Sequence, residues 1–199
     1  MHPNAAFRHP DRSMAEMLVA EIGFATIFLT TPDGPRVAHT PVWPTGDGAL
    51  QFHLARGNAL TRHLAGAVAL AVVDGPDAYV SPRWYADADQ VPTWNYVAVE
   101  CEGPVRRMEE EGLIALLETL SARHEALLEG PPWTMDKLSD RHRTALLRGI
   151  VGFEMEVRSW RETFKLSQNK PAEERRRVAE GLEAAGAPAI AALMRSIAP

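Results

Sequence analysis

Residues 24–54 read FATIFLTTPDGPRVAHTPVWPTGDGALQFHL, and this stretch decides the fold. β-Branched and aromatic residues predominate in three runs that are typical of short strands, at 24–30, 36–43 and 49–54. Between the runs lie TPDG at 31–34 and PTGDG at 44–48, in which proline presets φ and glycine accepts a positive φ. The stretch therefore predicts a meander of short antiparallel strands.

The remainder of the chain adds strands and helices to this meander. Further strands are predicted at 67–73, around 79–81 after a turn at Asp74-Gly75-Pro76, at 93–102 before an interruption at Gly103-Pro104, and at 150–157. Apolar spacing predicts helices at 13–22, 109–129, 139–147, from Pro171 onward and at 187–197. Because there is no βαβ alternation and no GxGxxG, we expect a mainly β fold, a small closed barrel with inserted and C-terminal helices.

The composition excludes several classes of protein. Lysine and arginine number 21 against 26 aspartates and glutamates, so the formal net charge of the 199-residue chain is −5. An acidic chain has no general electrostatic attraction for nucleic acid or for an anionic membrane. The first residues lack the apolar region of a signal peptide, and no apolar run approaches the roughly 20 residues of a membrane helix. Because Cys101 is the sole cysteine, we expect a soluble protein of the reducing cytoplasm.

A first candidate site follows the third predicted strand. Residues 52–58, FHLARGN, pass from the strand through Gly57 into a short helical turn. Backbone N–H groups at such a turn, with Arg56 beside them, can bind a phosphate, and Asn58 would cap the turn or contact the ligand. The same residues are also typical of an ordinary strand-to-helix turn with a solvated arginine.

Two further stretches have an unusual composition. YVSPRWY at 79–85 and VPTWNY at 91–96 gather tryptophan and tyrosine beside prolines. Such a cluster can wall a planar ligand, but it is equally typical of a barrel core or a dimer interface. FKLSQNKP at 164–171 places basic and amide side chains before a proline that starts a helix, where they can reach a phosphate or lie in a solvated loop.

Metal and nucleophile sites are not expected. The seven histidines include no HxxxH or HExxH spacing and the chain has no CxxC, so the sequence predicts no metal site. GxSxG is absent, and the glutamates on both sides of Cys101 disfavour a thiolate nucleophile.

Taken together and in this order, the segments resemble the PaiB family, whose members are described as FMN-binding negative transcriptional regulators. The resemblance rests on HPNAAF at 2–7, HTP at 39–41, HLARGN at 53–58, YVSPRWY, VPTWNY and KLSQNKP at 165–171. It implies the FMN-binding type of split β-barrel. A flavin-binding domain would span residues 1–160 with a helical insertion at about 109–148, and a cofactor-closing segment with C-terminal helices would span 161–199.

The same resemblance implies the residues of a flavin site. In split barrels the second and third strands and the following turn hold the flavin and its phosphate, and a later segment, often from the partner subunit, closes over the cofactor. The matching positions are Thr40, Pro41, His53, Leu54, Arg56 and Asn58, with Lys165, Gln168 and Lys170 in the closing segment. FMN is therefore the expected cofactor, in two equivalent sites of a homodimer, and no catalytic residue is implied.

Three functions remain open. By resemblance the chain is a negative transcriptional regulator or a flavin-dependent sensor. A flavin-dependent oxidoreductase of an unknown small substrate is the alternative, because in such enzymes the cofactor carries the redox chemistry. Heme binding or degradation, with His39, His53 or His63 as axial ligand, is the third. Charge does not support direct DNA binding, because residues 161–186 carry six basic against five acidic side chains and form no basic stripe.

Overall fold

The computed structural model describes residues 2–8 and 11–197. The description leaves out Met1, residues 9–10 and residues 198–199. The predicted domains 1–160 and 161–199 include these residues, so this part of the prediction lies outside the described residues. The chain divides into two compact units that are built from separated segments. Unit 1 comprises residues 1–18, 74–99 and 161–199, and unit 2 comprises residues 19–73 and 100–160. The predicted closing segment therefore belongs to the same unit as the N-terminal segment and the middle of the chain.

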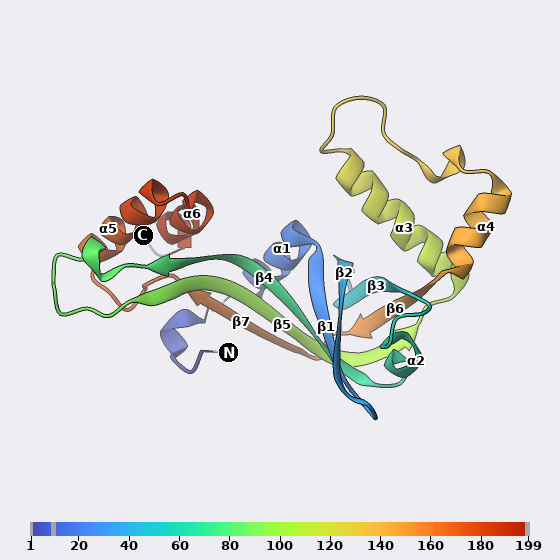
Figure 1. The fold of residues 1–199 in the computed structure, drawn as a ribbon, viewed down its shortest axis with the longest axis horizontal. Coiled ribbons are helices and arrows are strands. Elements are labelled where there is room, and N and C mark those ends of the chain that lie inside the picture. The colour runs from blue at the N-terminus through green and yellow to red at the C-terminus, as the bar shows by residue number, and fades with distance from the viewer. Residues whose placement is uncertain (1, 9–10, 198–199) are drawn as a thin grey trace. The chain divides into compact units, whose positions relative to one another are not determined.

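Seven strands form the sheet of the described chain (Figure 1). They are β1 (Phe24–Thr31), β2 (Gly34–Pro44), β3 (Ala49–Ala55), β4 (Val68–Val80), β5 (Thr93–Arg107), β6 (Ile150–Glu156) and β7 (Ser159–Lys165). Their order across the sheet is β4-β1-β2-β3-β6-β5-β7, and a further pairing of β4 with β5 closes the first six strands into a ring. The fold is therefore mainly β with a closed barrel, as the sequence predicts.

The meander at the start of unit 2 is confirmed. β1 pairs antiparallel with β2, and β2 with β3. The two turns between these strands place Gly34 and Gly48 at φ values of 94° and 92°, a region that favours glycine. Because successive strand residues point to opposite faces, β1 buries every second side chain and turns Phe24 and Phe28 outward. The rings of Phe52 and Phe153 stack in the core with centroids 5.6 Å apart.

Two predicted breaks in the strands are wrong. β4 continues through Asp74-Gly75-Pro76, where the sequence predicts a turn. A Cβ atom at position 75 would lie 3.1 Å from the Cβ of Val97, so this glycine allows a close approach of two strands. β5 likewise continues through Gly103-Pro104. A Cβ atom at position 103 would lie 1.8 Å from the carbonyl oxygen of Glu156, so only glycine fits there.

The strand β7 is absent from the sequence prediction. Its residues, SWRETFK, include only two large apolar side chains, and their burial does not alternate along the strand. Neither signal that identifies a half-buried strand is therefore present in the sequence. As a result Lys165, which the prediction places in a polar segment, is the last residue of a strand.

In residues 2–8 and 11–197, six α-helices and three short 3₁₀-helices accompany the strands (Figure 1). The α-helices are α1 (Arg12–Ile22), α2 (Thr61–Leu64), α3 (Glu110–Glu125), α4 (Asp140–Arg148), α5 (Ala172–Ala184) and α6 (Pro188–Ile197), and the 3₁₀-helices are η1 (Ala5–Phe7), η2 (Pro82–Trp84) and η3 (Met135–Lys137). The helix predicted at 109–129 ends at Glu125, and Leu127 beyond it is exposed. No helix in the described part of the chain has both the length and the apolar character that a membrane crossing requires.

The core of unit 1 is built on α5 and α6, which pack against strand residues such as Val97 and Phe164. Gly181 of α5 allows close packing against η2, because a Cβ atom there would lie 2.4 Å from the Trp84 ring. Unit 1 therefore has its own hydrophobic core, separate from the barrel interior of unit 2.

Candidate functional site

The predicted cofactor residues of β2 and β3 lie on neighbouring strands of unit 2. Thr40 is buried, and its Oγ1 donates a hydrogen bond to the carbonyl oxygen of His53, 2.6 Å away. Pro41 pairs with Phe24 of β1 and is partly exposed. The side chain of Leu54 is buried. The structure thus brings Thr40 and His53 together and uses the Leu54 side chain for packing.

The imidazole of His53 has an unsatisfied polar atom. Its Nδ1 is buried and makes no hydrogen bond. Burial lowers the pKa of His53, because desolvation disfavours the charged ring, so the imidazole is neutral at pH 7. A neutral ring offers one N–H donor and one acceptor nitrogen. Because a buried polar atom without a partner costs free energy, this position suits contact with a polar atom of a ligand.

Arg56 and Asn58 build the turn that follows β3. The guanidinium of Arg56 donates from Nε to the carbonyl oxygen of Arg148 at 2.7 Å and from Nη2 to that of Ile150 at 3.2 Å. Within the described residues no carboxylate pairs with Arg56, so its charge is not neutralised by a salt bridge. The Oδ1 of Asn58 accepts a hydrogen bond from the N–H of Leu60 at 2.9 Å and thereby caps the turn.

The turn leads into α2, which has four residues and therefore contributes little helix dipole. Any attraction for an anion here comes from the Arg56 side chain. Arg56 also lines a cavity of about 420 Å³ whose wall includes Arg107, Glu109 and Glu110. The wall carries both signs of charge, so this cavity as a whole does not select an anion.

The three predicted residues of the closing segment lie in unit 1. Lys165 Nζ donates to Thr93 Oγ1 at 2.6 Å and to the carbonyl oxygen of Trp94. Lys170 Nζ donates to Gln90 Oε1 at 2.6 Å. Gln168 instead bonds within its own segment, because its Oε1 accepts from the N–H of Leu166 at 2.7 Å and its Nε2 donates to the carbonyl oxygen of Phe164. Gln168 therefore holds the backbone turn.

Lys165 and Lys170 line one cavity of unit 1, with a volume of about 240 Å³. Its lining also draws on HPNAAF, YVSPRWY and VPTWNY, so that four of the motifs quoted from the sequence meet there: His2, Asn4, Phe7, Tyr85, Gln90, Val91, Thr93, Asn95, Ser167 and Asn169 complete the wall. Of these residues, Asn95 and Ser167 are buried polar residues absent from the predicted site. Asn95 belongs to VPTWNY and Ser167 to KLSQNKP, and membership in these motifs is the sequence signal that could have identified both as site residues.

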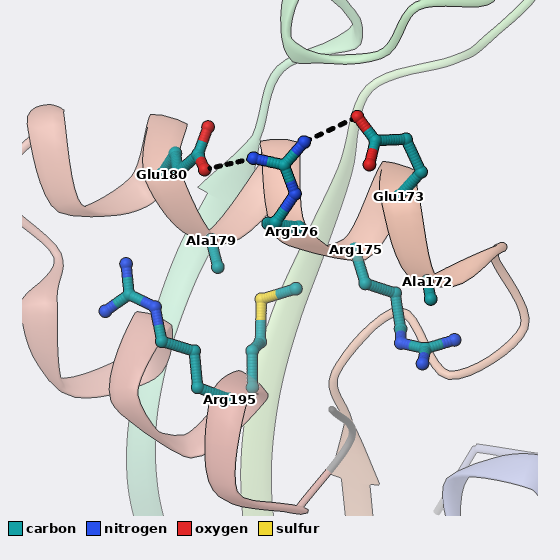
Figure 2. Close-up of a pocket in the computed structure, with 8 residues that line it drawn as sticks. Ala172, Glu173, Arg175, Arg176, Ala179, Glu180 and Arg195 are labelled. Atoms are coloured by element: carbon teal, nitrogen blue, oxygen red, sulfur yellow. Dashed lines mark hydrogen bonds and ion pairs between the residues drawn. The ribbon is translucent and has the colours of Figure 1, made fainter.

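A larger cavity of about 520 Å³ lies between α5 and α6. Figure 2 shows Arg176 on its wall held between two carboxylates, with Nη2 2.6 Å from Glu173 Oε1 and Nη1 2.8 Å from Glu180 Oε1. Arg195, on the same wall, pairs with Glu183. Neighbouring glutamates thus neutralise the charges of Arg176 and Arg195 in this cavity.

The other histidines considered as ligands have protein partners in unit 2. His39 Nδ1 lies 3.0 Å from Thr26 Oγ1, and His63 Nε2 accepts from Arg62 Nε at 2.8 Å. Among the described residues, no three metal-binding side chains come together.

Solved structures with a similar fold define the class. The chain superposes on the FAD and heme binding protein of Mycobacterium smegmatis with a TM-score of 0.60 and 19% identity, covering 84% of this chain and 77% of that protein. It superposes on the flavocytochrome Anf3 of Azotobacter vinelandii with a TM-score of 0.59 and 14% identity, covering 82% and 72%. At such identities the likeness concerns the fold. The predicted split β-barrel is confirmed.

Sequence comparison identifies the family within this class. Residues 1–159 match the family described as "Putative FMN-binding domain", and the chain belongs to that family. It is 33% identical to the protease synthase and sporulation protein PAI 2 of Bacillus subtilis over 157 residues, 76% of this chain and 74% of that protein. An uncharacterized protein of Aspergillus fumigatus is 30% identical over 158 residues, 69% of this chain and 60% of that protein. FMN as the cofactor and the resemblance to PaiB are thereby confirmed.

Proposed function

We propose that this protein is a flavin-dependent sensor of the PaiB type, which binds FMN as a homodimer and exerts any effect on gene expression without reading DNA itself. The charge of the C-terminal helices α5 and α6 is the observation that argues against direct contact with DNA. In the C-terminal helices, ion pairs hold Arg176 between Glu173 and Glu180 and join Arg195 to Glu183. Neutralised arginines release few counterions from a nucleic acid, so they contribute little to binding it.

Residues of unit 2 would hold the flavin. We assign its phosphate to Arg56 and Asn58, because the guanidinium is oriented by two carbonyl oxygens and has no carboxylate partner among the described residues. The unsatisfied Nδ1 of His53 would meet a polar edge of the ligand. Thr40, Pro41 and Leu54 would contribute mainly through their strands. Bound FMN supplies an isoalloxazine ring that accepts and releases electrons, and the protein orients it and tunes its surroundings.

A second copy of the chain would cover one face of the unit 2 barrel. Thr26 and Phe28 of β1 stand opposite His39 and Val37 of β2, and this face also carries Phe24 and Val68. Phe24, Phe28, Val37 and Val68 are 50%, 39%, 49% and 60% exposed, an unusual density of large apolar side chains on one exposed sheet. A face of this kind can pair with itself about a two-fold axis, the commonest symmetry of oligomers. This supports the proposed homodimer.

The alternative is a flavin-dependent oxidoreductase. The cavity of about 240 Å³ in unit 1 favours an oxidoreductase, because a small substrate can bind in a cavity that polar side chains line. The two functions differ in turnover. An oxidoreductase with a suitable donor and acceptor would turn over continuously, whereas the flavin of a sensor would be reduced once.

Direct DNA binding can be tested with the intact, FMN-loaded protein. We expect no saturable rise in the fluorescence anisotropy of a labelled DNA duplex at micromolar protein and low salt, with FMN either oxidised or reduced. As a control, the double variant Glu173→Gln, Glu180→Gln leaves Arg176 unpaired and should increase any weak binding. Saturable binding by the wild type that weakens steeply with added salt would show that the protein contacts DNA directly.

A further inference from the structure

The cavity of about 240 Å³ in unit 1 has a positively charged wall. Lys165 and Lys170 contribute two ammonium groups, and among the described residues no aspartate or glutamate lines the cavity. The recorded partners of both ammonium groups are neutral, namely Thr93, the Trp94 carbonyl and Gln90. Within the described residues neither lysine forms an ion pair. Burial lowers the pKa of Lys165, because desolvation disfavours the charged ammonium group. No carboxylate among the described residues compensates for this desolvation.

The polar floor of this cavity is buried and hydrogen-bonded. Asn95 is fully buried, and its Nδ2 donates to Ser167 Oγ at 3.0 Å. Ser167 has a φ of 63°, the only positive φ of a non-glycine residue in the described chain. Such a backbone conformation is strained for a residue other than glycine, and it clusters at ligand sites, where surrounding structure enforces it. The Asn95 contact and the turn held by Gln168 enforce it here.

The walls above this floor combine aromatic surface with cationic groups. Lys165 Nζ lies 5.9 Å from the centroid of the Phe7 ring, and Lys170 Nζ lies 5.5 Å from that of the Tyr85 ring. The ring of His2 meets Phe7 edge to face, with centroids 4.6 Å apart. The cavity therefore offers an apolar surface for a small organic body beside two positive charges.

The use of lysine in this chain is also selective. The sequence has 18 arginines and three lysines, and two of the lysines line this one cavity. Elsewhere in unit 1, Arg176 pairs with Glu173 and Glu180, as Figure 2 shows, and Arg195 pairs with Glu183. Lysine differs from arginine in presenting a compact point charge with donors that can turn toward a ligand. The two cavity lysines thus differ from Arg176 and Arg195 in both residue type and pairing.

We propose that this cavity is a binding site for a small organic anion, whose carboxylate or phosphate is held by the ammonium groups of Lys165 and Lys170 and whose body lies against Phe7 and Tyr85. This proposal gives Lys165 and Lys170 an anion other than FMN, in place of the cofactor-closing role that the family resemblance implies. The flavin phosphate stays assigned to Arg56 of unit 2. It does not rest on the regulatory role proposed above. Its ligand is either the signal of a sensor or the substrate of an oxidoreductase.

Calorimetric titration of the FMN-loaded protein tests this site with three matched probes: benzoate, phenyl phosphate and uncharged benzamide. We expect saturable binding of at least one of the two anions and at least tenfold weaker binding of benzamide. The double variant Lys165→Met, Lys170→Met keeps the aliphatic bulk of both side chains, and we expect it to weaken anion binding at least tenfold with unchanged FMN affinity. Lys137→Met, outside the cavity, should bind like the wild type.

Three outcomes would overturn the proposal: no saturable binding of either anion, equal binding of benzamide, or unchanged anion binding by the double variant. A parallel loss of FMN affinity in the double variant would also overturn it, because the lysines would then hold the flavin. If the double variant does not fold, the single variant Lys170→Met replaces it. Among the described residues, the Lys170 side chain donates a hydrogen bond to Gln90 alone, so the substitution should spare the fold while weakening anion binding.

Discussion

An Arg56→Ala variant is expected to bind FMN about 10- to 100-fold more weakly than the wild type, because a charge-assisted hydrogen bond to a phosphate contributes roughly 1.5–3 kcal/mol. Riboflavin has the same ring system without the phosphate, so its affinity should change little. Titration of both ligands, followed by flavin fluorescence, gives the comparison directly.

The structural role of Arg56 requires two controls. Its guanidinium also bonds to the carbonyl oxygens of Arg148 and Ile150, so the melting temperature of the variant must be measured alongside its affinity. Arg62→Ala removes an exposed arginine of α2 that pairs with Asp33, and FMN affinity should not change. If Arg56→Ala weakens FMN and riboflavin equally, Arg56 does not contact the phosphate.

A Phe28→Glu variant is expected to be a monomer. The substitution places a charge at the centre of the exposed sheet face formed by β1, β2 and β4, where a second copy would bury it. An unpaired charge in a buried interface costs about 3–5 kcal/mol, which weakens dimerisation roughly a hundred- to several-thousand-fold. Light scattering should return twice 21.9 kDa for the wild type and 21.9 kDa for the variant.

The matched control for the dimer is Leu127→Glu. Leu127 is 79% exposed and follows the end of α3, so it is not part of the strands β1, β2 and β4 that form the proposed interface, and this variant should remain a dimer. A wild type that scatters as a monomer at micromolar concentration would contradict the homodimer. A Phe28→Glu variant that remains dimeric would place the interface elsewhere.

The barrel meander could be predicted because its signals are local. Turn glycines and β-branched runs within residues 24–54 specify strands and turns without information from the rest of the chain. The breaks predicted at Gly75 and Gly103 are wrong for a reason that is not local. Both glycines serve close approach to distant residues, Val97 and Glu156, and a sequence alone does not distinguish a packing glycine from a turn glycine.

The candidate sites show the same limit. The motifs that line the unit 1 cavity could be recognised one by one, but their meeting depends on pairs such as Asn95 with Ser167, which lie 72 positions apart. The role of Gln168 was equally hidden, because amide side chains bond to a ligand or to their own backbone with the same chemistry. The carbonyl partners of Arg56 come from residues 92 and 94 positions away, beyond any local pattern.

The visible absorption spectrum of the purified protein, recorded after addition of FMN and removal of free flavin, tests flavin binding most directly. We expect flavin bands that stay with the protein, in an amount equal to that of the chain, and that riboflavin treated in the same way largely fails to produce. Reduction should bleach these bands and air should restore them. A spectrum without flavin bands, or one in which added heme gives a Soret band while FMN is lost, would contradict an FMN site in this barrel.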